Sequence, residues 1–173
     1  MKQRYLYGDA NLIEELLSKF QLIETAAGGF ASVYKEPSAR AFWLKYYATA
    51  ATQGGGYLTL IRLPAPATEE LIDIAISTDH EDEAVAAILR LLDEEAIEKK
   101  NFRHTLIKRL EQLMLGREVP KERLVKIIKL SGLDDPMNRR ELLQKSNEQI
   151  EEDALYFISI AERAKNLLPR LQR

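Results

Sequence analysis

The composition of the chain changes near Thr78, and this change constrains the fold more than any other feature of the sequence. Trp43, most of the tyrosines and all but two of the glycines lie in the first 60 residues. After Thr78, Leu, Ile, Ala, Glu, Lys and Arg dominate, and these residue types favour helix. The sequence therefore predicts an α+β fold, with an amino-terminal helix packed on a small antiparallel sheet and a helical carboxy-terminal half. We expect residues 1–78 to form the α/β part and residues 79–173 the helical part, either as two parts or within one compact domain.

The amino-terminal part contains one helical pattern and three strand patterns. Apolar residues recur at helical spacing from Asn11 to Glu24, and two glycines follow that would end such a helix. Strand patterns cover residues 30–36, 41–47 and 57–63, with a short turn between the first two that predicts an antiparallel hairpin. We expect the second of these strands to be central and covered on both sides, with Trp43 in the core.

Four helical segments are predicted after the sheet. The first is a short helix from Thr68, and the second is a long helix from Thr78 or Asp79 that can continue to Leu115. The third covers residues 120–130, and the fourth covers residues 135–168. Gly132 is placed as a carboxy-terminal glycine of the third helix. Asp135 followed by proline is expected to cap the last helix.

Several kinds of catalytic and cofactor site are disfavoured by the residues present. The chain has no cysteine, so thiol nucleophiles and thiolate metal sites are excluded. His80 stands among Asp79, Glu81, Asp82 and Glu83, but the spacing of a metal-binding motif is absent, and the cluster is better explained as complementing a helix dipole. We therefore expect no catalytic residues, no cofactor and no metal.

The glycine triplet does not have the surroundings of a phosphate-binding loop. Residues 54–56 are three glycines followed by a strand pattern, which favours a hairpin loop over a phosphate-binding loop that leads into a helix.

No apolar stretch near the amino terminus resembles a secretion signal, and the longest uncharged stretch is too short and too polar to cross a membrane. These observations lead us to expect a cytoplasmic protein with no membrane contact.

Charge is distributed unevenly along the sequence. Residues 1–100 carry 10 basic and 16 acidic residues, whereas residues 101–173 carry 15 basic and 11 acidic residues. From residue 79 to residue 98 there are eight acids and one base, a pattern that would attract a cationic protein or form an ordinary solvated helix face. From residue 103 to residue 129 there are eight bases and three acids, a pattern that could contact nucleic acid or remain solvated.

The segment from residue 9 to residue 65 has a helical pattern followed by a series of spaced residues: Gly29, Tyr34, Pro37, Arg40, Trp43, Tyr46 and Gly54 to Gly56. With these residues the segment resembles a family of small immunity proteins from bacterial polymorphic-toxin and contact-dependent growth inhibition systems. That family has a helix before a Gly-Trp-Glu-x-Leu-Tyr-x-Asp-Pro segment, then Gly-Arg-x-Trp-Glu, a Tyr-Pro pair and Gly-Gly-Gly-Pro. The chain departs from the pattern at Phe30, Ala31, Glu36, Ala39, Leu44, Tyr47 and Tyr57.

The resemblance implies a protein that binds one cognate toxin domain and neutralises it without catalysis. Toxins of this kind are often nucleases with basic clefts, so an acidic surface would complement them. On this basis we expect a partner-binding surface that includes Asp79, Glu81, Asp82, Glu83, Asp93, Glu94, Glu95, Tyr46, Tyr47 and Gln53. The alternative is a nucleic-acid-associated or regulatory module that uses the basic helices.

Overall fold

The computed structural model describes residues 3–116 and 118–172, with only the backbone described at residues 52 and 53. The chain forms two compact units, Met1–Asp93 and Glu94–Arg173. The division lies inside helix α4 (Glu81–Glu98) and not at residue 78, where the composition changes. The structure confirms the α+β class, and each unit is described separately below.

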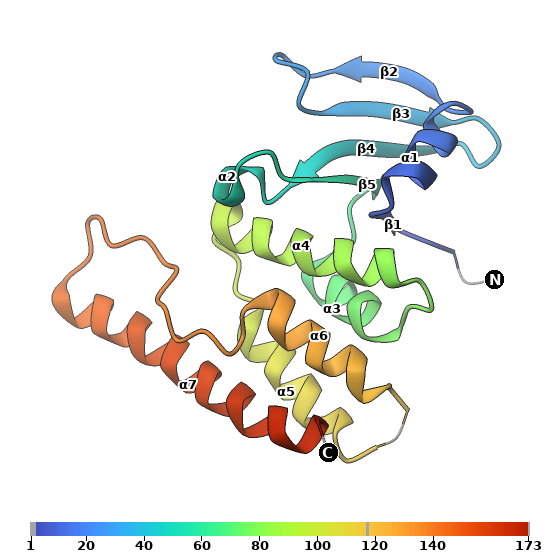
Figure 1. The fold of residues 1–173 in the computed structure, drawn as a ribbon. Coiled ribbons are helices and arrows are strands. Elements are labelled where there is room, and N and C mark those ends of the chain that lie inside the picture. The colour runs from blue at the N-terminus through green and yellow to red at the C-terminus, as the bar shows by residue number, and fades with distance from the viewer. Residues whose placement is uncertain (1–2, 117, 173) are drawn as a thin grey trace. The chain divides into compact units, whose positions relative to one another are not determined.

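The first unit is built on a five-stranded antiparallel sheet with the strand order β1-β5-β4-β3-β2. Its strands are β1 (Leu6–Tyr7), β2 (Gln21–Thr25), β3 (Ser32–Glu36), β4 (Ala41–Ala48) and β5 (Tyr57–Leu63). In Figure 1, β2 is the outermost strand on one side, and helices α3 (Thr68–Ser77) and α4 lie on the side of β1 and β5. The three predicted strands are therefore present, and β1 and β2 are additional.

The predicted helix over residues 11–24 is wrong in its second half. Helix α1 covers only Ala10–Leu17, and residues 21–25 form strand β2 instead. The Asp9 side chain accepts a hydrogen bond from the Leu12 amide at 2.9 Å and so caps the helix. Pairing of β2 with β3 satisfies the backbone of this segment, and this tertiary pairing overrides the helical spacing of its apolar residues.

A hydrophobic core lies between α1 and one face of the sheet. Ile13, Trp43 and Leu60 are buried there, and the Tyr7 and Phe20 rings pack against the indole of Trp43. The prediction that Trp43 belongs to the core is confirmed, since its exposed fraction is 4%.

The prediction that β4 is covered on both sides is only partly correct. Phe42 and Tyr47 of this strand are exposed, whereas Ala41, Trp43 and Ala48 are buried. The helices of this unit therefore leave part of β4 uncovered.

The long helix predicted from residue 79 to residue 115 is divided in two. Helix α4 ends at Glu98, and α5 (Arg103–Leu113) begins after a break at Lys99, whose φ is 58°. No glycine or proline marks this break in the sequence. In a continuous helix, residues 95 and 103 would be separated by about 12 Å along the axis. The break lets the Arg103 guanidinium reach the Glu95 carboxylate at 2.6 Å.

The second unit consists of α5, α6 (Lys121–Ser131) and α7 (Asn147–Leu171), with α5 and α6 both packed on α7. Gly132 follows α6 in the left-handed conformation, as predicted. The last helix begins at Asn147 and not at Asp135, so the predicted cap at Asp135 is wrong. The Asp135 carboxylate instead accepts the Met137 amide at 3.0 Å and forms a turn, while Ser146 and Gln149 form the capping box of α7.

Among the described residues of the second unit, Arg103 is the most deeply buried charged side chain, with an exposed fraction of 0%. It donates two hydrogen bonds to the Glu95 carboxylate, at 2.6 and 2.8 Å, and one to the Gly132 carbonyl at 3.0 Å. The Phe102 and Phe157 ring centroids each lie 5.2 Å from its guanidinium carbon. This one side chain therefore joins the end of α4, the end of α6 and the middle of α7.

Replacing Arg103 with Met should lower the free energy of unfolding by about 3–5 kcal/mol, because Glu95 would keep its charge without a partner. The double variant Arg103→Met, Glu95→Met should lose less, since no buried charge remains. Urea unfolding followed by circular dichroism measures both changes. Lys108→Met, at an exposed position of the same helix, is the matched control. Equal losses in R103M and K108M would contradict the role given to Arg103.

Candidate protein-binding site

Asp82 and Glu83, in the first turn of α4, contact the sheet of their own unit. The Glu83 carboxylate accepts hydrogen bonds from the Tyr5 and Leu6 amides, at 2.7 and 3.2 Å, and from the Thr78 hydroxyl at 2.5 Å. Asp82 accepts the Gly8 amide at 3.0 Å and pairs with Arg4 at 2.6 Å. These carboxylates therefore occupy the free edge of β1, the position where another strand could otherwise add.

The environment of Asp82 keeps its carboxyl ionised. Burial alone would raise the pKa of Asp82, but the hydrogen bonds from the Gly8 amide and from Arg4 outweigh burial and hold this pKa below its ordinary value. The charge is therefore used inside the unit, to bind backbone donors and one guanidinium.

Asp93, in the second half of the same helix, also accepts a hydrogen bond from a backbone amide. Both of its carboxylate oxygens accept the Thr49 amide, at 2.9 and 3.1 Å, and the side chain is buried. Thr49 has a φ of 60°, at the start of the short helix α2 (Ala50–Gln53) between β4 and β5. Burial raises the pKa of Asp93, although the Thr49 amide and the nearby Arg90 act in the opposite direction.

The remaining predicted acids divide into buried and exposed groups. Glu94 is buried, and Glu95 is held by Arg103, both in the second unit. Asp79 and Glu81 are exposed. Most of the acids expected on the binding surface are thus engaged in internal contacts. The sequence could not predict this, because it does not distinguish a carboxylate that binds strand amides from one in solvent.

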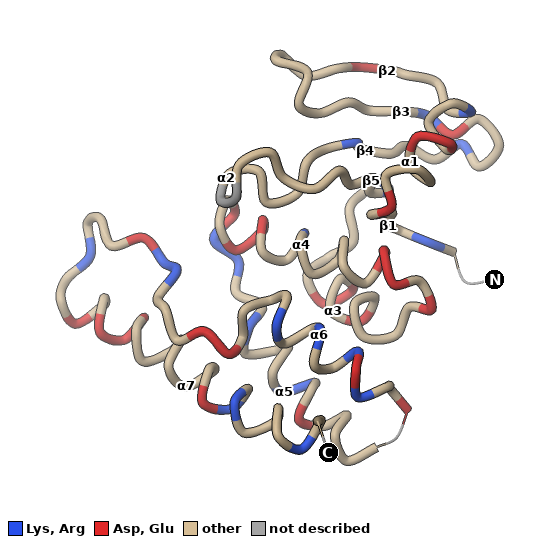
Figure 2. Tube along the Cα trace, in the orientation of Figure 1, with Lys and Arg blue, Asp and Glu red and all other residues tan. Residues whose placement is uncertain are grey.

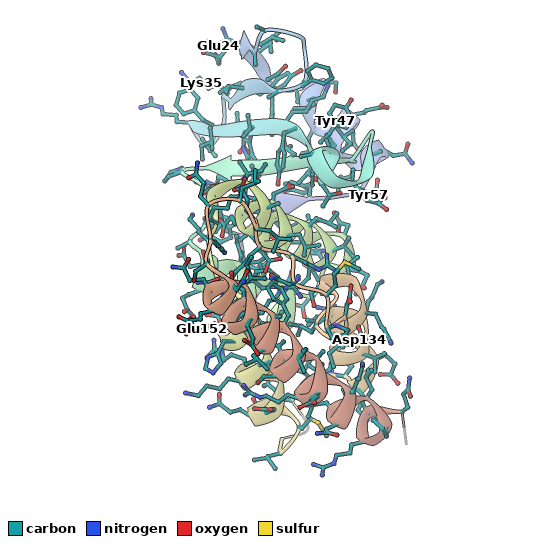
Figure 3. The ribbon with its side chains drawn as sticks, turned by 90° about the vertical axis from the view of Figure 1, so that its left-hand side faces the viewer. Glu24, Lys35, Tyr47, Tyr57, Asp134 and Glu152 are labelled. Atoms are coloured by element: carbon teal, nitrogen blue, oxygen red, sulfur yellow. The ribbon has the colours of Figure 1, made fainter. Side chains whose placement is uncertain are left out.

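The predicted tyrosines lie at a hollow formed by loops of the first unit. This hollow has a volume of about 570 Å³ and is lined by Gly28, Gly29, Phe30, Tyr46, Tyr47, Ala50 and Gly55. Figure 3 shows Tyr47 and Tyr57 at the same end of the sheet, beside α2. The Arg90 guanidinium lies 6.0 Å from the Tyr46 ring centroid. Gln53 was also predicted here, but its side chain lies outside the part of the chain that the structure describes.

Phe30 is the residue of this hollow that sequence reasoning did not select. It follows the tight turn between β2 and β3, in which Gly28 and Gly29 have φ of 89° and 75°, values that favour glycine. A Cβ atom at Gly28 would lie 3.0 Å from the Phe30 ring, so the ring rests on this glycine. Phe30 is nevertheless 75% exposed. Its position directly after two turn glycines is the sequence feature from which an exposed aromatic residue could have been predicted.

The other side of the hollow is shaped by the loop from Thr49 to Gly56. A Cβ atom at Gly56 would lie 2.8 Å from the Ala48 carbonyl oxygen, and Gly56 has a φ of 65°, so this position requires glycine. This close contact brings the loop back against the end of β4. Tyr47, the residue before Ala48, is 39% exposed.

The lining of the hollow combines aromatic rings with very small residues. Its described lining contains aromatic rings, glycines and one alanine, with no carboxylate and no basic group. Rings of this kind provide contact area for an apolar or aromatic side chain of a partner, and the tyrosine hydroxyls can add hydrogen bonds. Next to the hollow, strand β2 is exposed along its whole length, and Leu22 and Ile23 are large apolar residues among its exposed side chains.

Replacing Glu83 with Ala should lower the free energy of unfolding of the first unit by about 1–3 kcal/mol, because the Tyr5 and Leu6 amides would lose their acceptor. Trp43 is the only tryptophan in the chain, so urea unfolding followed by its fluorescence reports on this unit. Glu81→Ala removes an exposed acid from the same turn of α4 and should lose less than about 1 kcal/mol. The assignment would be wrong if both variants lost the same amount.

Replacing Asp93 with Asn tests the raised pKa of this carboxyl. Because the folded pKa lies above the unfolded one, folding favours the protonated form. The contribution is complete below the unfolded pKa and is lost as pH rises through the folded pKa. The stability of the unmodified chain relative to Asp93→Asn should therefore fall as the pH rises above the unfolded pKa of about 3.9. Trp43 fluorescence in urea measures it, with Asp79→Asn as an exposed control. A relative stability that rises with pH would contradict this prediction.

The described residues also bear on metal binding and on membrane spans. Among the described residues, no group of three or more His, Cys, Asp or Glu side chains could hold a metal ion. In the same part of the chain, no helix has the length and apolar character needed to span a membrane. Comparison of the chain with protein-family models, with curated proteins and with solved structures gives no match.

Proposed function

We propose that this chain is an immunity protein that binds a cognate bacterial toxin domain and neutralises it by protein–protein contact in the cytosol of the producing cell. The observation that carries the proposal is the aromatic hollow of the first unit, which is defined by Phe30, Tyr46 and Tyr47 on fixed glycine loops. The resemblance of residues 9–65 to immunity proteins covers the same loops. The proposal needs no catalytic group.

The exposed aromatic residues have the properties of an interface anchor. Phe30 is 75% exposed and Tyr57 is 55% exposed, and both lie next to turns of the same sheet. Tyrosine and phenylalanine are enriched at the centres of interfaces, where a few side chains provide most of the binding energy. A protein that keeps such rings in solvent at a hollow gains free energy when a partner covers them.

The acidic charge of the first unit acts at longer range in this proposal. Residues 1–93 carry 8 basic and 13 acidic residues. Figure 2 shows acidic residues at the start of α3 and α4 in this unit. Since Asp82, Glu83 and Asp93 are engaged internally, their charges contribute to the potential that attracts a basic partner, while Asp79 and Glu81 lie at exposed positions. A nuclease toxin with a basic cleft fits this potential.

Strand β2 offers a second mode of contact. Carboxylates of α4 occupy the edge of β1, whereas β2 is exposed at the opposite edge of the sheet. An extended segment of the toxin could pair with this strand through main-chain hydrogen bonds. The aromatic hollow would then provide the side-chain specificity of the same contact.

Replacing both Phe30 and Tyr47 with Ala should weaken toxin binding by about 30-fold or more, because hot-spot residues contribute about 2 kcal/mol or more. The toxin to test is the carboxy-terminal domain of a polymorphic toxin encoded next to this chain. Growth rescue on co-expression and the Kd of the purified complex are the two measurements. Leu115→Ala, at a 92% exposed position of the second unit, is the control and should bind like the unmodified chain.

Two results would overturn the proposal. One is failure of the unmodified chain to bind and rescue against this toxin domain. The other is strongly salt-dependent binding of random RNA or DNA at physiological ionic strength without toxin binding, which would support the nucleic-acid module instead. Equal affinity of the unmodified chain and the F30A/Y47A variant would remove the aromatic hollow from the interface.

A further inference from the structure

The outer face of α7 is left uncovered by the other helices of the second unit. Helices α5 and α6 pack on α7, whose inner side buries Phe157, Ile160 and Leu167. The opposite side has exposed residues from Glu148 to Arg170, and Figure 3 shows α7 in front of the other helices of this unit. A helix of 25 residues is about 37 Å long, so a second helix can pack along this face over several turns.

Two large apolar side chains lie near the middle of this outer face. Leu155 is 58% exposed and Ile158 is 40% exposed. They are three residues apart, so they are neighbours on the helix surface. Exposed charged residues flank them on both sides along the helix. An apolar centre with a polar rim is the arrangement found at protein interfaces.

Charge divides α7 into two halves of opposite sign. Residues 147–158 carry four acids and no base, whereas residues 159–171 carry three bases and one acid. Figure 2 shows this change from acidic to basic residues along the helix.

Only two of these charges are paired within the unit. Asp153 pairs with Arg140 and Lys145, and Arg163 pairs with Glu111 at 2.6 Å. The other charged residues of α7 are exposed, and among the described residues they form no ion pair: Glu148, Glu151, Glu152, Glu162, Lys165 and Arg170. The outer face therefore presents three acids before its apolar centre, and two bases and one acid after it.

The spacing of these charges is nearly symmetric about Ile158. Along the helix axis, Glu152 lies about 9 Å before Ile158 and Lys165 about 10.5 Å after it. Glu148 lies about 15 Å before Ile158 and Arg170 about 18 Å after it. If two copies of α7 pack antiparallel about a two-fold axis near Ile158, each of these acids faces a base of the other copy, and the apolar centres meet.

We propose that this chain forms a homodimer by antiparallel packing of the outer faces of α7 from two copies. The charge pattern favours a second copy over another partner, because a basic protein would match only the first half of the helix and an acidic protein only the second half. A two-fold axis forms every contact twice, so a few ion pairs and two apolar residues are used on both copies. This contact goes beyond the proposed toxin contact, which uses the first unit.

The dimer is expected to be weak and reversible. One pair of helices buries less surface than the roughly 1,600 Å² of a standard interface. Glu162 also lies next to the apolar centre without a base opposite it. We therefore expect a dimer Kd in the range of about 1–100 μM, rising with salt because the ion pairs are exposed.

Sedimentation velocity of the full chain without toxin, at low salt and at several loading concentrations up to about 200 μM, tests this proposal. The unmodified chain should show a concentration-dependent monomer–dimer equilibrium. The variants E148K/E152K and K165E/R170E should each dimerise about tenfold more weakly or worse, because each substitution acts twice and replaces attraction with repulsion. An equimolar mixture of the two variants should dimerise again, since its opposite charges are restored between the two chains.

A matched control and the contrary outcomes complete the experiment. The variant K108E/E122K reverses two exposed charges on α5 and α6 and should dimerise like the unmodified chain, and circular dichroism checks that every variant is folded. A chain that stays monomeric at all concentrations would overturn the proposal. It would also be overturned if the control lost as much affinity as the α7 variants, or if the mixture failed to dimerise. A monomeric chain whose α7 variants bind toxin more weakly would assign this face to the toxin instead.

Discussion

The first unit depends on hydrogen bonds between the carboxylates of α4 and backbone amides of the sheet and its loops. Asp82 and Glu83 bind the chain around β1, and Asp93 binds Thr49 at the opposite end of the helix. These two attachment points are separated by about 16 Å along the helix axis. A buried amide without an acceptor is costly, so these carboxylates fix the position of β1 and of the β4–β5 connection together. The edge of β1 is closed as a consequence, and β2 is the edge that stays open.

The candidate site follows from the attachment at Asp93. By holding the Thr49 amide, Asp93 sets the path of the loop that returns through Gly56, and the close approach of Gly56 to the Ala48 carbonyl brings the two ends of this loop together. Tyr47 is thereby presented beside Phe30, which a second glycine turn supports from the other side of the hollow. The aromatic rings remain exposed because the loops beneath them are fixed by polar contacts and not by burial of the rings themselves.

Sequence patterns predicted the elements whose stabilising contacts are local. Strand β5 and helix α3 match their expected ranges closely, and Gly132 ends α6 as a left-handed glycine should. The predictions are wrong where a contact with a residue distant in sequence determines the secondary structure. Strand β2 has apolar residues at helical spacing but pairs with β3. The break at Lys99 has no glycine or proline, and the Arg103–Glu95 contact stabilises it instead. For the candidate site, Tyr46 and Tyr47 were named from the sequence and line the hollow, and their role in binding stays a prediction. The internal contacts of Glu83 and Asp93 could not be predicted, since their amide partners lie far away in sequence.

The net charge of −2 conceals the electrostatic character of the two units. Residues 1–93 have 8 basic and 13 acidic residues, whereas residues 94–173 have 17 basic and 14 acidic residues. In the first unit three acids of α4 are bound to backbone amides, so their charge would reach a partner only as a potential, which salt screens over about 8 Å at physiological ionic strength. In the second unit several cations are held in pairs with carboxylates, among them Arg103 with Glu95 and Arg140 with Asp153. In both units, therefore, much of the charge first stabilises internal contacts, and only what is left over can act on other molecules.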